Sequence, residues 1–445
     1  MEVLIEQIVV YGVVFLLIGI FIFIYLKKKN VKSVETIKKV EIAKEEGLYE
    51  PVSLHPYINL NTCIGSAACI SECPEKDILG IVDGKATVIN TSNCIGHGAC
   101  FHACPVEAIS LRIGTESRGV DLPHVNENFE TNSKGIFIAG ELGGMGLIKN
   151  SVEQGQQAMD SIAKSKKPSK ENVIDVVIVG AGPAGISASL AAKKHGLSSI
   201  TLEQDSLGGT VYTFPRAKIV MTSPMDLPLY GKVKLYDTSK DELLQLWKKV
   251  IAENDLKIVE NTKVEEIIPI DNDCFKVITG SGEEYICNHV LLAIGRRGSP
   301  RKLNIPGEES EKVAYRLLEP ERITNKKVIV VGGGDSAIES ALLLKDKNEV
   351  ILSYRNDKFS RLKPKNKEKI EEAIADNSID VIYNSNLTSI EDNFVLMQKS
   401  ENAAPEHVEN DLVYIFAGGE LPTGFLQKAG VEISKRFGYI IKKHN

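Results

Sequence analysis

The chain has 445 residues with a formal net charge of −6, and 43% of the residues are hydrophobic and 25% charged. These values are ordinary for a globular protein, and the length suffices for two to four domains with hydrophobic cores. The acidic balance argues against a nucleic-acid-binding protein, so we expect no nucleic-acid partner.

The first predicted element is a membrane anchor. Residues 8–26 form an uncharged apolar run, which at about 1.5 Å per residue spans about 30 Å, the thickness of a bilayer core. Three lysines follow at 27–29, whereas the residues before the run are acidic, unlike the basic start of a signal peptide. We therefore expect residues 1–30 to form an uncleaved single-pass anchor in the cytoplasmic membrane, with the later domains cytoplasmic and a linker over 31–54. A buried core helix is the alternative.

Two cysteine motifs of identical spacing come next. They are CIGSAACISECP at 63–74 and CIGHGACFHACP at 94–105, with a hairpin turn predicted at 83–84 between them. Six cysteines packed this closely in a reducing compartment indicate metal binding rather than disulfides. The place of a second cysteine holds Ser66 in the first motif and His97 in the second.

The stretch 55–115 resembles the two-cluster bacterial ferredoxins, in which the fourth cysteine of each motif binds the other cluster. The resemblance implies a small α+β domain with two iron–sulfur clusters, of the 4Fe-4S or 3Fe-4S type, because hydroxyl and imidazole groups are unusual fourth ligands. A degenerate, cluster-free fold is the alternative. Carried over, one cluster takes Cys63, Cys69 and Cys104 with Ser66, and the other takes Cys94, Cys100 and Cys73 with His97.

A glycine-rich segment, TNSKGIFIAGELGGMGLIKN, precedes a helix expected to begin near Leu147. A basic linker over 164–172 then leads to the first nucleotide-binding motif. In this motif a buried strand is followed by Gly180, Gly182 and Gly185, the GxGxxG pattern that lets a pyrophosphate approach a helix N-terminus. Glu203 follows the second strand, where an acid is expected to bind a ribose.

A second motif, VVGGGDSAIES, repeats the pattern with Gly332, Gly334 and Ala337. Its second strand ends without an acid and is followed by Arg355 and Arg361. Arginines suit the 2′-phosphate of NADPH, which an acid would repel, so the sequence favours NADPH over NADH. The alternative is that these arginines only end a solvated strand.

Residues 173–445 resemble the thioredoxin-reductase-like flavoproteins, and in layout most of all the bacillithiol-disulfide-reductase-like ones. The resemblance rests on the two glycine motifs, on the crossover HVLLAIGRRGSP and on the return segment DLVYIFAGGELP. It implies an α/β fold with two Rossmann-like domains, one binding FAD (173–300 with 411–445) and one binding NAD(P)H (301–410).

That family closes with a GIFAAGD-type segment and a helix that face the flavin, and the sequence after Tyr439 does not supply them. The segment 116–163 matches them instead, so we interpret it as a permuted flavin-binding segment. In this interpretation Gly140 and Glu141 take the place of the glycine and the acid, and the backbone N–H of Lys149 faces the flavin.

The predicted function is a membrane-anchored NAD(P)H oxidoreductase that uses FAD and iron–sulfur clusters. Hydride would pass from nicotinamide to flavin, and single electrons would pass through the clusters to or from a redox protein or a quinone at the membrane. A homodimer is implied by the family resemblance alone. Ala184 stands where the bacillithiol-disulfide-reductase-like proteins carry a cysteine, which disfavours thiol chemistry. A small-disulfide reductase with structural clusters and a non-catalytic redox sensor are the alternatives.

Overall fold

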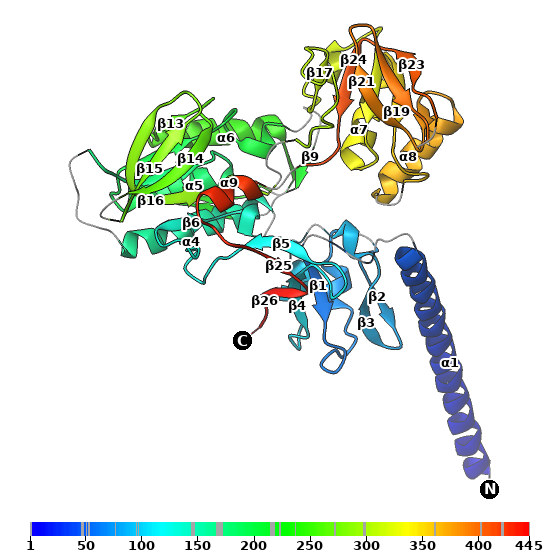
Figure 1. The fold of residues 1–445 in the computed structure, drawn as a ribbon. Helices are drawn as coiled ribbons and strands as arrows, with labels where there is room; N and C mark the ends of the chain where they lie inside the picture. The colour runs from blue at the N-terminus through cyan, green and yellow to red at the C-terminus, as the bar shows by residue number, and fades with distance from the viewer. Residues whose placement is uncertain are drawn as a thin grey trace. The chain divides into compact units, whose positions relative to one another are not determined.

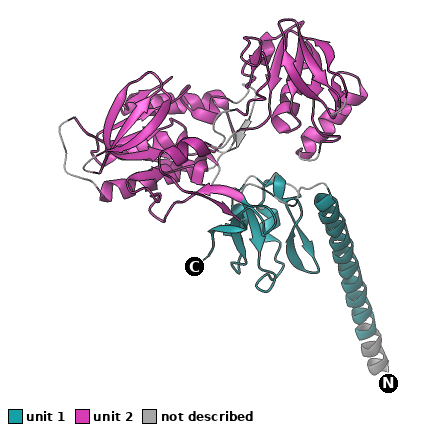
Figure 2. Ribbon diagram, in the orientation of Figure 1, with its two compact units in different colours: residues 1–119, 437–445 teal, residues 120–436 magenta. Residues whose placement is uncertain are grey.

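The structure is a computed structural model that divides into two compact units. Unit 1 contains residues 1–119 and 437–445, and unit 2 contains residues 120–436 (Figure 2). The residues described are 2–45, 49, 51, 54–75, 77–94, 96, 98–143, 147–165, 172–213, 219–221, 224–235, 237–270, 273–296, 300–359, 362–400, 403–419 and 422–444.

Unit 1 begins with one long helix, α1 (Glu2–Glu45). Within the described part of the chain it is the one helix long and apolar enough to cross a membrane. The prediction of a linker from residue 31 is wrong for 31–45, which continue the helix. This stretch contains no glycine or proline, and Ser33, Thr36 and Ala43 become buried against the rest of the unit, so packing stabilises the extra turns.

The remainder of unit 1 is a small α+β structure. Its three-stranded antiparallel sheet has the order β1-β4-β26 (Figure 1). The predicted hairpin is confirmed, with Asp83 and Gly84 at φ 49° and 77°, the positive values that a two-residue turn requires. The elements are β1 (Leu54–Ile58), α2 (Ala68–Ser71), β2 (Leu79–Val82), β3 (Lys85–Val88), η1 (Thr91–Asn93), α3 (Ala99–His102), β4 (Ile109–Ile113) and β26 (Tyr439–Lys442).

The C-terminal strand belongs to unit 1, which corrects the assignment of all of 411–445 to the flavin-binding domain. Strand β26 pairs antiparallel with β4, with Tyr439 opposite Ile113. Beyond it, the ring of His444 stacks on Phe101 at 3.7 Å between centroids. The segment is a strand, as expected, but the free edge of β4 rather than a flavin-domain strand supplies its partner.

Unit 2 contains a seven-stranded sheet of order β13-β8-β7-β16-β15-β14, in which β6 also pairs with β16. The strands β13, β8, β7, β16 and β6 are parallel, and their apolar residues form a core with fully buried Val177, Val290 and Leu292. The elements are β6 (Ile136–Ile138), α4 (Ile148–Lys164), β7 (Ile174–Val179), α5 (Pro183–Lys194), β8 (Ser199–Leu202), α6 (Lys240–Glu253), β13 (Ile258–Val259), β14 (Val264–Ile270), β15 (Cys274–Thr279), β16 (Glu284–Leu292) and α9 (Thr423–Lys428).

Among the described residues, the shorter elements of this part of unit 2 are three two-stranded pairs and two 3₁₀ helices. Strand β5 pairs with β25, β9 with β12, and β10 with β11. Their bounds are β5 (Val120–Pro123), η2 (Glu141–Gly143), η3 (Gly209–Val211), β9 (Ile219–Met221), β10 (Met225–Leu227), β11 (Gly231–Val233), β12 (Asp237–Ser239) and β25 (Ile433–Arg436).

A second parallel sheet in unit 2 has the order β17-β24-β18-β19-β20, and a three-stranded antiparallel sheet β21-β22-β23 accompanies it. The α/β class predicted for this part of the chain, after a small α+β domain, is confirmed. The elements are β17 (Val313–Ala314), η4 (Pro320–Arg322), β18 (Lys327–Val331), α7 (Asp335–Leu344), β19 (Glu349–Ser353), α8 (Pro364–Ala375), β20 (Asp380–Ile382), β21 (Asn386–Ile390), β22 (Phe394–Gln398), β23 (Glu406–Glu409) and β24 (Leu412–Ile415).

Candidate dinucleotide and iron–sulfur sites

The three glycines of the first motif occupy three different environments between β7 and α5. Gly180 has φ +104°, and a Cβ there would lie 2.6 Å from the carbonyl oxygen of Ala293. A Cβ on Gly185 would lie 1.8 Å from the oxygen of Gly180. Beside Gly182, by contrast, no atom of the described residues lies within 4 Å of a Cβ position. The turn is therefore tight at two glycines and open at the helix N-terminus, which fits a pyrophosphate.

Glu203 lies at the end of β8, next to this turn. Its carboxylate accepts hydrogen bonds from the backbone N–H groups of Ala181 (2.7 Å) and Asp205 (3.1 Å). The side chain is 5% exposed, and burial raises the pKa of Glu203 although both N–H groups oppose the shift. The acid predicted from the sequence is thus adjacent to the glycine turn and held in a fixed orientation.

The segment interpreted as permuted forms part of the same sheet and of the same helical layer. Strand β6 pairs parallel with β16, and α4, which begins at Ile148 as expected, packs against α5. A Cβ on Gly155 of α4 would lie 2.1 Å from the oxygen of Ala184, and Ser187 Oγ donates to the oxygen of Val152 (2.7 Å). The sequence analysis missed Gly155, although a glycine in the interior of an otherwise good helix is a signal of close packing.

Gly140 and Glu141 follow β6. Gly140 has φ +85°, and its N–H donates to Gln154 Oε1 at 2.8 Å. Burial lowers the pKa of Arg296, while the carboxylates of Glu141 and Asp121 oppose this shift, so the guanidinium interacts electrostatically with the acid of this segment. The side chain of Lys149 lies along α4, with Nζ 3.8 Å from Glu153 Oε1.

The second motif repeats the geometry of the first between β18 and α7. Gly332 has φ +137°, and a Cβ there would lie 2.6 Å from the oxygen of Phe416. The position beside Gly334 has no described atom within 4 Å, and Ala337 is fully buried. A Cβ on Gly333 would lie 2.1 Å from the ring of Tyr354, so this ring covers the turn.

The end of β19 presents polar rather than acidic groups. Ser353 is fully buried, and its Oγ lies 2.8 Å from Ser385 Oγ. Arg355 follows with an exposed side chain. Arg361, the other predicted 2′-phosphate ligand, lies outside the described residues.

In unit 1 the strongest electrostatic interactions among the motif cysteines follow two sets of three. Burial raises the pKa of Cys69, and the charges of Cys104 and Cys63 raise it further. Burial raises the pKa of Cys94 to about 11, and the charge of Cys73 raises it further. Burial raises the pKa of Cys100 to about 12, and its cysteine neighbours are, in order, Cys94, Cys73 and Cys69. The sets Cys63–Cys69–Cys104 and Cys73–Cys94–Cys100 each combine residues of both motifs.

Thiols grouped in this way are hard to ionise unless a cation offsets their mutual repulsion, as iron does in a cluster. Backbone N–H groups already point at three of the sulfurs, from Ala86 to Cys63 (3.3 Å), from Gly96 to Cys94 (3.4 Å) and from Ala108 to Cys104 (3.2 Å). Such bonds favour the thiolate form. The donor set therefore fits iron–sulfur clusters.

The structure gives less information on the two predicted ligands that are not cysteines. Ser66 is exposed, and His97 lies outside the described residues. Among the described residues, no three His, Cys, Asp or Glu side chains converge on one point that could hold a single metal ion. In a cluster each cysteine binds a different iron, so the sulfurs stand further apart than the ligands of one ion.

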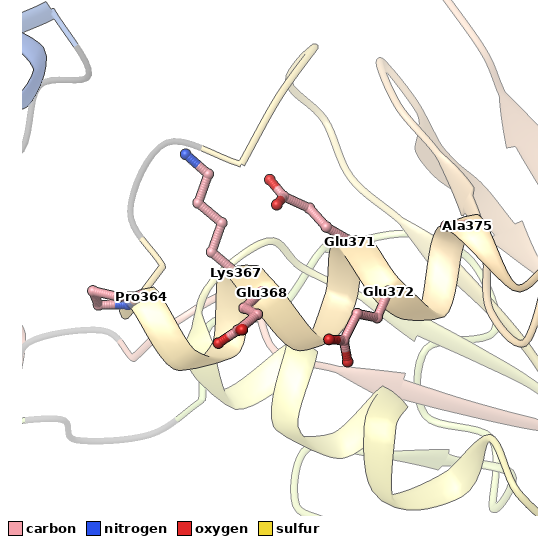
Figure 3. Close-up of a pocket in the computed structure, with 6 residues that line it drawn as sticks. All are labelled: Pro364, Lys367, Glu368, Glu371, Glu372 and Ala375. Atoms are coloured by element: carbon pink, nitrogen blue, oxygen red, sulfur yellow. The ribbon is translucent and has the colours of Figure 1, made fainter.

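Two other features of unit 2 do not form a redox or nucleotide site. Cys274 and Cys287, the cysteines outside the motifs, are 4% and 0% exposed in β15 and β16, so they are core residues, as predicted. A hollow on the surface of α8 is lined by residues of that helix alone, including Glu368, Glu371 and Glu372 (Figure 3). Three carboxylates would repel the phosphates of a nucleotide.

Comparison with known proteins finds one family for the nucleotide-binding part of the chain and another for the cysteine-rich part. Residues 177–443 match the family model described as pyridine nucleotide-disulphide oxidoreductase, and residues 55–105 match the 4Fe-4S dicluster domain. Because the first match covers more than half of the chain, the protein belongs to the pyridine nucleotide-disulphide oxidoreductase family. It is an NAD(P)H-dependent flavoprotein oxidoreductase with an iron–sulfur domain.

Particular relatives have different activities. The chain is 26% identical over 267 residues to bacilliredoxin reductase Bdr of Bacillus subtilis, covering 59% of this chain and 82% of that protein. It is 30% identical over 188 residues to a ferredoxin–NADP reductase of Ignicoccus hospitalis, covering 42% and 57%. The fold resembles bacillithiol disulfide reductase Bdr from Bacillus cereus, with a TM-score of 0.51, 24% identity and coverage of 61% and 85%.

Proposed function

We propose that this protein is a membrane-anchored NADPH oxidoreductase that passes electrons between nicotinamide, FAD and two iron–sulfur clusters, and so to or from a redox partner at the membrane. The observation that carries the proposal is that one chain contains both two open glycine turns, in unit 2, and two sets of three cysteines, in unit 1.

The first turn would hold FAD. The N-terminus of α5 beside Gly182 would receive the pyrophosphate, and Glu203 would accept hydrogen bonds from ribose hydroxyls. Gly140, Glu141 and the N-terminus of α4 would complete the site from the permuted segment. FAD supplies the conversion between two-electron hydride chemistry and one-electron transfer.

The second turn would hold NADPH. Gly334 leaves the N-terminus of α7 open to the pyrophosphate. Arg355 would pair with the 2′-phosphate, since its exposed guanidinium follows the strand that in NADH-binding proteins ends in an acid.

Iron–sulfur clusters rather than thiols would carry the electrons onward. A disulfide reductase needs a reachable cysteine near the flavin, and the two cysteines of unit 2 are buried in β-strands. The ferredoxin–NADP reductase among the relatives gives a precedent for electron exchange with a ferredoxin-type centre. Here that centre would be part of the same chain, with the apolar part of α1 as the anchor.

An anaerobic titration of the detergent-solubilised full chain with NADPH tests this proposal. Visible absorbance should show bleaching of the flavin, and EPR spectra of the same samples should then show reduced clusters, with line shapes that distinguish four-iron from three-iron forms. Bleaching without any cluster signal in an iron-containing sample would contradict the relay from NADPH, and absence of iron would contradict the cluster assignment.

A further inference from the structure

The helix that carries the apolar segment is joined to the hairpin β2–β3 of unit 1 in a regular register. As the residue number rises along one face of α1, the number of the hairpin partner falls. The pairs are Lys29 with Gly84, Ser33 with Asp83, Thr36 with Gly80, and Lys39 with Asp77. The hairpin therefore lies antiparallel along α1, and its turn points back toward the apolar segment.

The contacts in this joint are specific. The backbone N–H of Asp83 donates to Ser33 Oγ (3.1 Å), which in turn lies 3.4 Å from Asp83 Oδ1. Lys39 Nζ is 2.8 Å from Asp77 Oδ1. A Cβ on Gly80 would lie 2.5 Å from Thr36 Cγ2, and Ser33 and Thr36 are only 6% and 9% exposed. The helix is thus packed onto the unit and is not a flexible tether.

This register fixes the height of the hairpin turn relative to the apolar segment. Lys29 lies three residues after Leu26, about 5 Å along the helix axis. A Cβ on Gly84 would lie 3.3 Å from Lys29 Nζ, and the N–H of Asp83 bonds Ser33 Oγ, so the turn lies between the heights of Lys29 and Ser33, about 5–10 Å beyond Leu26. The polar layer on each side of a bilayer core is about 5–8 Å thick, so an α1 that spans the membrane would place the turn at the headgroup layer.

The loop that carries the first cysteine lies beside this turn. A Cβ on Gly65 would lie 1.8 Å from the oxygen of Gly84, and Lys85 Nζ donates to the oxygen of Cys63 (2.6 Å). Two apolar side chains of the loop are exposed, Leu60 at 55% and Ile64 at 64%.

We propose that the loop 60–65 of unit 1 rests on the lipid bilayer, with Leu60 and Ile64 inserted at the headgroup layer. The inference rests on the membrane anchor of the proposed function. Apolar side chains beside lysines are typical of interfacial contacts, and the lysines at 27–29, 32 and 85 favour anionic headgroups, with Asp83 as the opposing carboxylate. The site of Cys63, Cys69 and Cys104 is then held at the membrane surface, where a lipid-soluble or membrane-embedded partner can reach it.

The test uses tryptophan as a depth probe in the full chain, reconstituted in nanodiscs of mixed neutral and anionic phospholipid. The chain has one native tryptophan, Trp247, which is fully buried and gives a constant background. Ile64→Trp and, independently, Leu60→Trp should lose emission when the lipids carry bromine on the acyl carbons nearest the headgroup. Ile440→Trp is the matched control, because Ile440 is also exposed (42%) but lies on β26, across unit 1 from the hairpin in Figure 1.

Each variant is first checked for wild-type iron–sulfur absorbance, which shows that unit 1 is intact. Loss of emission at positions 64 and 60 but not at 440 supports the contact. Equal emission of all three variants in brominated and ordinary nanodiscs overturns it, even if the anchor holds. A chain that does not enter nanodiscs overturns the anchor and this contact together, while the NADPH titration still tests the electron relay separately.

Discussion

The two glycine turns of unit 2 have the same backbone course but differ in what surrounds them. In the first, Gly185 is required because the oxygen of Gly180 occupies the space of any Cβ, whereas the second accommodates Ala337 at the same place. The first ends in the buried acid Glu203 and the second in Ser353 and the exposed Arg355. The comparison teaches that the glycine turn is shared, while the packing behind it and the end of the next strand differ, as the proposed binding of two different nucleotides requires.

The largest effect is expected for Gly185→Ala. The new methyl group would overlap the oxygen of Gly180, so α5 must move away from the turn, at a cost of about 1–3 kcal/mol of unfolding free energy. The purified variant should contain little flavin, measured by the ratio of visible to ultraviolet absorbance, and should unfold at a lower temperature.

The reciprocal change, Ala337→Gly, sharpens the same comparison. It removes a helix-favouring methyl group without a clash, so a loss of only about 1 kcal/mol is expected, with normal flavin content. If Gly185→Ala retained full flavin and stability, the two turns would not differ in packing as described.

The next effect concerns Glu203→Gln. A glutamine amide has only one acceptor oxygen, so the N–H of Ala181 or of Asp205 loses its partner, and FAD affinity should fall about 10- to 100-fold. Equilibrium dialysis against FAD measures this loss. Glu253→Gln, on the exposed face of α6, is the control and should leave the affinity unchanged.

The same acid predicts a pH dependence. Burial raises the pKa of Glu203 above the ordinary 4.5, and only the ionised carboxylate accepts with both oxygens. FAD affinity should therefore fall as the pH drops through this raised pKa and level off above it. The Glu203→Gln protein should lack this step, and a step that persists in the variant would assign the titration to another group.

The smallest effect is expected for Arg355→Ala. Loss of an exposed guanidinium should raise KM for NADPH about tenfold and leave KM for NADH nearly unchanged, because only NADPH has the 2′-phosphate. Steady-state dye reduction with both nucleotides gives the ratio. Arg322→Ala, which removes a surface ion pair with Glu319, serves as the control. Equal changes for both nucleotides would contradict the assignment of NADPH.

Much of the fold could be predicted because local patterns determined it. The glycine turns, the hairpin at 83–84 and the helix after Leu147 each follow from short-range chemistry in which neighbouring residues decide the backbone conformation. The gathering of each cysteine set from both motifs was implied by family resemblance, not by the spacing itself.

The features that sequence reasoning missed depend on contacts between distant segments. Nothing near Ser33 or Thr36 reveals that these polar residues will be buried against a hairpin some fifty residues later. The strand at 439–442 was recognisable, but a strand pattern does not name its partner. Gly155 is meaningful only because the oxygen of Ala184 lies where its side chain would be.

Strand β26 affects the time at which the sheet of unit 1 can be completed during synthesis. It completes a sheet whose other strands end at Ile113, more than 300 residues earlier. At about 5–20 residues per second, a ribosome needs tens of seconds to synthesise the intervening chain. During that interval the edge of β4 is bare and His444 is not yet stacked beside the helix of Cys100. Strand β26 can cover this edge only after the intervening chain has been synthesised.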